Sequence, residues 1–118
     1  MTMIKTVDPA EWRSFLGEFS ERNRGRRARF ELFGRTGTAR EEDQEGHFES
    51  ISIVDHTVNV KRTYEKQGQT ETMSDDIPDI HGISVQLDSD DSEDMIELSD
   101  TSGNLTALHF ESMVDGEN

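Results

Sequence analysis

The chain has 118 residues, enough for one ordinary domain and too few for two. It carries 26 Asp and Glu residues against 12 Lys and Arg, giving a formal net charge of -14. No run approaches the roughly 20 apolar residues of a membrane-spanning helix, and the acidic excess disfavours a nucleic-acid binder, because phosphates would repel it. We expect a single folded domain over residues 1–111 and a flexible acidic tail over residues 112–118.

The composition also bears on solvent and compartment. The basic residues are nine Arg and only three Lys. Molar salt shortens the Debye length to about 3 Å, so this acidity suits a salt-adapted protein, with an ordinary acidic bacterial protein as the alternative. The chain has no cysteine, which excludes disulfides and thiolate ligands. The first eight residues lack the apolar segment of a signal peptide, so we expect a cytoplasmic protein.

The clearest local pattern predicts an N-terminal helix over about residues 9–24. Asp8 is suited to the N-cap, and Pro9 to the first helical position. Apolar residues then follow at the spacing of one helix face: Trp12, Phe15, Leu16 and Phe19. Val7 precedes the cap, where it can pack on Trp12, and Gly25 is available as the C-terminal cap.

After Gly25 the apolar residues alternate, which is typical of strands. Strands are predicted at about residues 27–33, 38–43, 51–54, 58–66, 70–74, 83–87, 96–98 and 108–110. Turns are expected at 34–37, 55–57, 67–69 and 101–104, and loops at 44–47, 75–81 and 88–94. The predicted inner face of the sheet comprises Phe30, Leu32, Ile51, Ile53, Val58, Val60, Ile83, Val85, Leu87, Ile96, Leu98, Leu108 and Phe110.

These elements predict an α+β fold. The N-terminal amphipathic helix packs on a twisted antiparallel sheet of about six to eight strands, either open or curled toward a barrel. No segment between the strands is both long and apolar enough for a crossover helix, which argues against a parallel sheet.

The order of the predicted elements resembles a small bacterial family of uncharacterised single-domain proteins. The resemblance rests on the opening segment EWRSFLGEFS (Glu11–Ser20), the acidic middle, and the closing segment IELSDTSGNLTALHF (Ile96–Phe110). It covers nearly the whole chain and implies an N-terminal helix followed by an antiparallel β-meander. No activity is attached to these motifs.

The most informative local feature is an arginine-rich cluster. Five guanidinium groups fall within eight residues: Arg22, Arg24, Arg26, Arg27 and Arg29. Residues 1–40 are net +4, whereas residues 41–118 are net -18. The cluster is a candidate patch for an anion or an acidic partner. The alternative is structural, because arginines near the end of a helix complement its dipole and pair with the protein's own carboxylates.

Other motifs carry little chemistry. The acidic segment 88–94 fails as an EF-hand loop, because Glu93 occupies the sixth position and Ser99 the twelfth. The four histidines lack metal-ligand spacing, and we find no nucleophile elbow or phosphate-binding loop. His109 is expected on the outer strand face. The sequence therefore predicts no metal, no cofactor and no catalytic residue.

We interpret the protein as a non-enzymatic binding or interaction domain that uses the arginine-rich cluster to contact a protein partner. The alternative hypothesis is a small enzyme or small-ligand carrier with a pocket between helix and sheet. A deep pocket with convergent polar groups would favour the second hypothesis. We expect a monomer or a weak homo-oligomer.

Overall fold

The predicted helix is present in the computed structural model, which describes residues 3–37, 39–41 and 46–111. It begins as a 3-10 turn, η1 (Pro9–Glu11), and continues as α1 (Trp12–Asn23). Asp8 caps it as expected, because its Oδ1 accepts a hydrogen bond from the amide of Ala10 at 2.9 Å. Gly25 follows with φ +93°, a left-handed conformation that favours glycine.

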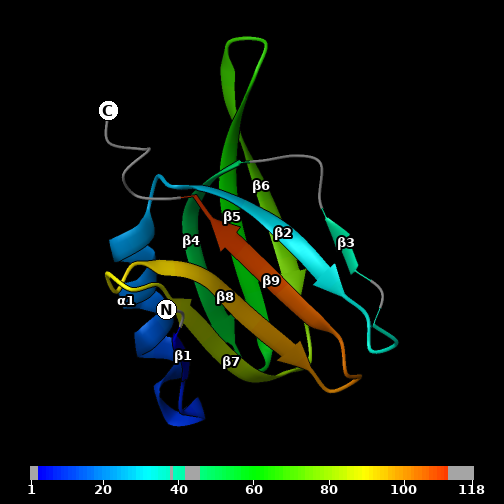
Figure 1. Ribbon diagram of the computed structural model, residues 1–118. Helices are drawn as coiled ribbons and strands as arrows, with labels where there is room; N and C mark the ends of the chain where they lie inside the picture. Colours follow the sequence, from blue (N-terminus) through cyan, green and yellow to red (C-terminus); the bar gives the residue numbers. More distant parts are fainter. Residues whose placement is uncertain (1–2, 38, 42–45, 112–118) are drawn as a thin grey trace.

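The described residues form one nine-stranded sheet in which every pairing is antiparallel. Its strands are β1 (Met3–Thr6), β2 (Arg27–Phe33), β3 (Ala39–Glu41), β4 (Gly46–Val54), β5 (Thr57–Lys66), β6 (Gln69–Ile77), β7 (Ile80–Leu87), β8 (Glu93–Asp100) and β9 (Leu105–Phe110). The order is β1-β7-β8-β9-β2-β4-β5-β6, with β3 on β2. The predicted α+β class is confirmed, and the sheet curls without closing into a barrel (Figure 1).

The expected strand count of six to eight was too low, because β1 was missed. Its four residues carry no clear alternation, and pairing with β7 holds them extended. The expected loop over residues 75–81 was also wrong for most of its length. Cross-strand pairing with β5 extends β6 to Ile77, and β7 begins at Ile80, so only Pro78 and Asp79 connect them.

Two other loop predictions were too long. Gly46 and His47 were expected in a loop but begin β4, where they pair with Ala28 and Arg27. Residues 93–94 were assigned to the acidic loop but begin β8. The predicted strand over residues 38–43 is present as β3, while residues 38 and 42–43, and the predicted tail over residues 112–118, lie outside the described residues.

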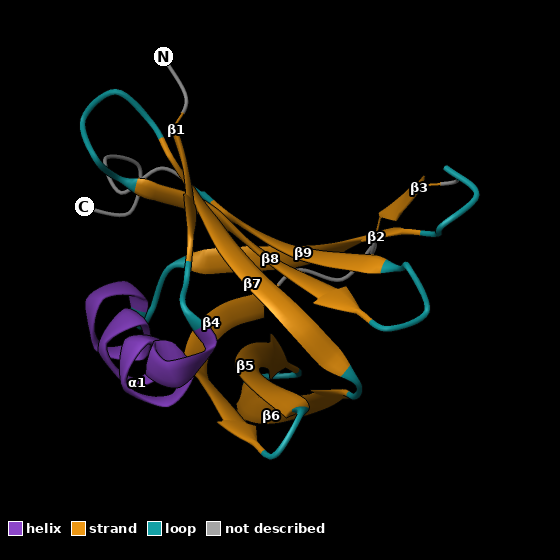
Figure 2. Ribbon diagram, turned by 90° about the horizontal axis from the view of Figure 1, so that it is seen from below, coloured by secondary structure: helices purple, strands orange, loops and turns teal. Residues whose placement is uncertain are grey.

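The core lies between α1 and the concave face of the sheet (Figure 2). Leu16 and Phe19 of α1 are fully buried, and Phe19 makes edge contacts with the rings of Phe48 and Phe110. The predicted inner face is buried apart from Leu32, which is 39% exposed, and Leu87, which is half-buried. The core therefore forms as the alternation predicts, with one exposed position on β2.

The sheet opens between β2 and β4. These strands pair only through Arg27 with His47 and Ala28 with Gly46, whereas β2 pairs with β9 through six residues. Beyond Ala28 the β4–β5–β6 part of the sheet separates from the β2–β9 part (Figure 2). Helix α1 packs on β4. This separation creates the site described next.

Candidate functional site

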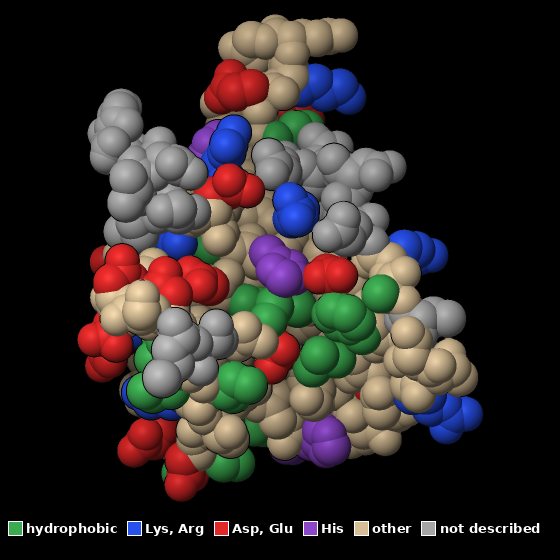
Figure 3. Space-filling model, viewed as in Figure 1, with side chains coloured by type: hydrophobic (Ala, Val, Ile, Leu, Met, Phe, Trp, Pro, Cys, Tyr) green, Lys and Arg blue, Asp and Glu red, His purple; other side chains and the backbone are tan. Residues whose placement is uncertain are grey.

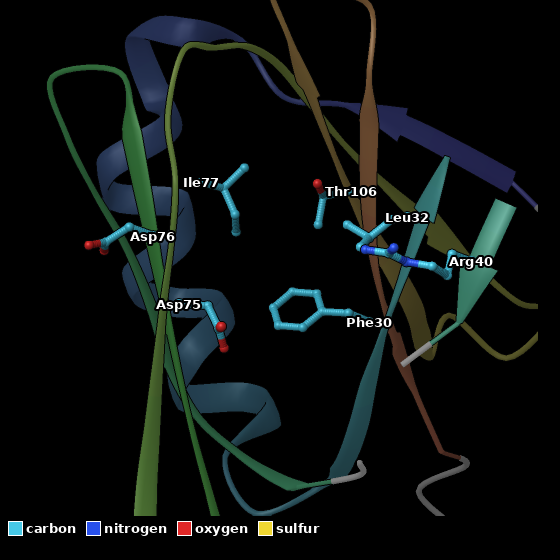
Figure 4. A pocket seen from close by; sticks show the side chains of 7 residues that line it. All are labelled: Phe30, Leu32, Arg40, Asp75, Asp76, Ile77 and Thr106. Atoms are coloured by element: carbon cyan, nitrogen blue, oxygen red, sulfur yellow. The ribbon is translucent and has the colours of Figure 1, made fainter. Parts of the chain in front are cut away.

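A cleft of about 340 Å³ lies between the two separated parts of the sheet (Figure 4). It is lined by side chains from four strands: Phe30, Leu32, Arg40, Asp75, Asp76, Ile77 and Thr106. This cleft is formed by the sheet alone, whereas the alternative hypothesis expected a pocket between helix and sheet.

The two walls of the cleft differ in chemistry. Phe30 and Leu32 from β2 stand beside Thr106 from β9, and they face Asp75 and Ile77 from β6 across the opening (Figure 4). The exposure of Leu32 follows from this position, because its side chain lines the cleft instead of filling the core. The cleft therefore combines apolar side chains with carboxylates on the β6 wall and the Arg40 guanidinium on the opposite side.

Arg62 of β5 lies buried behind Phe30. Its side chain is 0% exposed, and its guanidinium carbon is 4.5 Å from the centroid of the Phe30 ring, within cation–π range. Arg62 Nη1 donates a hydrogen bond to the carbonyl of Ala28 at 3.2 Å. The buried cation thus supports the wall of the cleft formed by β2.

Asp75 links this buried cation to the cleft. Its Oδ2 lies 3.6 Å from Arg62 Nη2, although the Asp75 side chain as a whole is 45% exposed. That oxygen is buried and accepts no hydrogen bond from the described residues. Oδ2 thus faces the buried cation, and the exposed remainder of the Asp75 carboxylate is the part that can accept a hydrogen bond in the cleft.

Sequence reasoning missed both members of this pair. Asp75 was placed in the loop over residues 75–81, and Arg62 fell within the predicted strand at 58–66 with no role assigned to it. The period of two could have found Arg62, because it shares the strand face of Val58 and Val60. An arginine in phase with buried valines indicates a buried cation, which needs a partner.

The arginine-rich cluster is spread over the end of α1, the following turn and β2. Arg22 forms a two-point ion pair with Glu93, at 3.1 Å from Nε and 2.8 Å from Nη2. Arg24 Nε donates to the carbonyl of Glu49 at 3.1 Å, and Arg24 Nη1 lies 3.4 Å from the Glu21 carboxylate. Both guanidinium groups therefore pair with groups of the same chain.

Arg26 is the most deeply engaged member of the cluster. Its Nη1 donates to Asn23 Oδ1 at 2.8 Å and to the carbonyl of Glu93 at 2.7 Å. The guanidinium also donates to the carbonyl of Glu111 and lies 5.1 Å from the Phe110 ring centroid. Burial lowers the pKa of Arg26. These contacts tie the end of α1 to β8 and to the end of β9.

The remaining two arginines come from β2. Arg27 Nη2 lies 3.6 Å from the Glu111 carboxylate, and the Arg29 side chain has a buried Nε. The structure thus brings Arg22 and Arg26 together around Glu93 and places Arg27 and Arg29 on an adjoining strand. Contact between the cluster and another molecule stays a prediction.

Glu93 gives the Arg22 contact a measurable pH dependence. Burial raises the pKa of Glu93, but hydrogen bonds from Arg22 and Asn23 outweigh burial and hold the pKa below its usual range. A carboxylate with a depressed pKa stabilises the fold above its unfolded value, near 4.3, and loses that contribution as pH falls through the folded value.

We therefore expect Glu93→Gln to lower the free energy of unfolding by about 1–2 kcal/mol at pH 7. The difference between wild type and variant should shrink as pH falls below about 4. Urea unfolding at pH 7 and pH 3 measures this difference. Glu18→Gln is the control, because Glu18 makes only a long ion pair with Arg22, at 4.0 Å on an exposed helix surface. A pH-independent difference would contradict this account of Glu93.

The acidic loop between β7 and β8 is closed by its own side chains. Asp88 Oδ1 accepts hydrogen bonds from the amides of Asp90 at 3.0 Å and Ser92 at 3.2 Å. Figure 3 shows carboxylates gathered at this end of the molecule, beside α1. Within the described residues, no group of three or more His, Asp or Glu side chains is arranged to hold a metal ion.

His109 lies on the outer face of β9, as expected, but it is only 33% exposed. Its Nε2 is 2.6 Å from Glu31 Oε1 on the neighbouring strand. The histidine is therefore held by a carboxylate and is less open to water than its place on the strand indicates.

A second depression, also of about 340 Å³, lies between the start of the helix and the turn joining β4 to β5. Its lining comprises Pro9, Ala10, Trp12, Arg13, Ile53 and Asp55. The polar atom of the Trp12 indole is already used, because Nε1 donates a hydrogen bond to the carbonyl of Val7 at 3.1 Å. This depression has no counterpart to the buried Asp75 oxygen among the described residues.

Among the described residues, no helix combines the length and the apolar character needed to cross a membrane. The chain matches no family model, no curated protein and no solved structure in the comparisons with known proteins. The resemblance to a bacterial family therefore stays a prediction.

Proposed function

We propose that the protein binds a small, mainly apolar molecule carrying a hydrogen-bond donor, in the cleft between β2 and β6. The observation that carries this proposal is the Asp75 carboxylate, which lines the cleft with a 45% exposed side chain while its Oδ2 is held 3.6 Å from the buried Arg62. A hydroxyl, amide or amine group of the ligand would bind the Asp75 carboxylate, while its apolar body contacts Phe30 and Ile77.

Size and location support the proposal. Ligand pockets typically measure about 300–1,000 Å³ and combine apolar walls with a few polar groups. The cleft, at about 340 Å³, lies at the small end of that range and therefore suits a small ligand. Leu32 supports the same proposal, because an apolar side chain that is 39% exposed gains by being covered.

A reporter ligand tests the proposal directly. N-phenyl-1-naphthylamine has two apolar ring systems and one N–H donor, and its fluorescence rises in an apolar site. We expect saturable binding by the full chain, with Thr106→Phe weakening it at least tenfold because the larger side chain fills the cleft from β9. Trp12 lies outside the cleft lining, so its fluorescence reports whether the variant remains folded.

The matched control is Leu105→Phe. Leu105 neighbours Thr106 on β9 but lies on the opposite strand face. Its replacement by phenylalanine therefore adds a ring to the same strand without filling the cleft. We expect this control to bind the reporter as wild type does. Absence of saturable binding by the wild type, or equal weakening by both variants, would contradict the proposal.

A second candidate function is contact with an acidic protein partner through the arginine-rich cluster. It is favoured by one observation: the side chains of Arg22, Arg24 and Arg27 remain about half exposed although they are paired within the chain. Replacing these three residues would weaken partner capture under this hypothesis and leave binding of the cleft reporter unchanged.

A further inference from the structure

The strand β1 has an open edge. It is the last strand of the sheet and pairs only with β7 within the described chain. All four of its side chains are exposed, including Met3 at 57% and Ile4 at 60%. An uncovered edge with apolar side chains is a template for pairing with another strand.

The direction of the free backbone groups follows from one hydrogen bond. The amide of Val7, just beyond β1, donates to the carbonyl of Ile83 in β7 at 2.9 Å. Residues of an antiparallel strand alternate between facing the neighbour and facing away. Lys5 and Met3 therefore face β7 like Val7, whereas Ile4 and Thr6 direct their N–H and C=O groups to the open edge.

The opposite edge of the sheet is chemically different. The nine residues of β6 include Glu71, Asp75 and Asp76 and no Lys or Arg. Two β6 edges would repel each other, since acidic strand edges oppose pairing. By contrast, β1 carries one charge, Lys5, whose Nζ lies 5.6 Å from the Phe15 ring centroid of its own chain.

We propose that two copies of this chain associate through their β1 edges, antiparallel about a twofold axis at Ile4. This register pairs Ile4 with Ile4 of the second copy through two backbone hydrogen bonds, because Ile4 directs both of its backbone groups to the edge. It also places Met3 opposite Lys5 of the second copy, so the aliphatic stem of the lysine covers the methionine. A twofold axis at Lys5 would instead oppose two ammonium groups.

The dimer is weak and strengthened by salt. The contact covers four residues of each copy. It therefore buries far less surface than a stable interface, which buries about 1,200–2,000 Å². Each chain also carries a formal charge of -14, and this repulsion is screened as the Debye length falls from about 10 Å at 0.1 M salt to about 3 Å at 1 M. We expect dissociation at micromolar concentration and dimers at millimolar concentration in 1 M KCl.

Charge substitution at the symmetry axis tests the register. Ile4→Lys and Ile4→Glu each place two like charges face to face across the twofold axis, and each should weaken association at least tenfold in sedimentation equilibrium. At 0.1 M KCl, where this pair is less screened, an equimolar mixture should associate more strongly than either variant alone, because opposite charges then face each other. Wild type that stays monomeric at millimolar concentration in 1 M KCl, or single variants that dimerise like wild type, would overturn the proposal.

Ile4→Pro tests the backbone hydrogen bonds. Proline removes an N–H that faces the open edge, which strand edges tolerate, so the pairing of β1 with β7 and the Trp12 fluorescence should be unchanged. We expect the same loss of dimers. Retained dimerisation by a folded Ile4→Pro variant would overturn the proposal, while reporter binding in the cleft is independent of either outcome.

Discussion

Replacing Phe19 by alanine is expected to lower the free energy of unfolding by about 3–5 kcal/mol. Phe19 is 0% exposed, and its ring makes edge contacts with Phe48 at 5.9 Å and Phe110 at 5.5 Å between centroids. These rings join α1 to β4 and β9, so the truncation removes apolar contacts and leaves a cavity at the centre of the core.

Phe15→Ala provides the matched control. Phe15 lies one turn earlier on the same helix, its ring is 6.0 Å from that of Phe19, and it is only partly buried. We expect less than half the loss seen for Phe19→Ala, because less apolar surface returns to water. Urea unfolding monitored by the buried Trp12 measures both variants, and equal losses would contradict the proposed packing of α1.

Arg62→Ala is expected to lower the free energy of unfolding by about 2–4 kcal/mol. The fully buried side chain packs on Phe30 and donates to the carbonyl of Ala28, so its loss leaves a cavity and removes a hydrogen bond. We expect no larger loss, because the Asp75 side chain is about half exposed and its carboxylate can be hydrated when the cation is removed.

Arg62→Met separates the volume of the side chain from its charge. Methionine fills much of the same space without a charge to desolvate. Replacing a whole buried ion pair by apolar residues is often close to neutral, and here the remaining partner, Asp75, is 45% exposed and can be hydrated. We expect the free energy of unfolding to change by less than about 1 kcal/mol, measured by the same urea titration. A loss as large as that of Arg62→Ala would show that the buried charge itself stabilises the fold.

The sequence predicted what depends on local chemistry. The structure confirms three features that depend on residues close in sequence: the Asp8 cap, the helix face that contains Leu16 and Phe19, and the alternation along β2, β5 and β7. What it missed depends on partners distant in the chain. Strand β1 forms because β7 pairs with it, although its four side chains are all exposed.

The cleft was missed for a related reason. It exists because β2 and β4 pair at only two positions and then diverge, a property of the whole sheet that leaves no local pattern. Leu32 alternates in phase with buried residues and was therefore assigned to the core, but the divergence exposes it. Arg62 alone offered a local signal, since it lies in phase with Val58 and Val60.

The most direct test of the central claim is a two-dimensional ¹H–¹⁵N NMR titration of the full chain with N-phenyl-1-naphthylamine. We expect saturable shifts centred on the amides of Phe30 and Leu32 in β2, Ile77 in β6 and Thr106 in β9, the strands that line the cleft. Shifts that do not saturate, or that centre on Trp12 and Ile53 at the second depression, would contradict binding in the cleft.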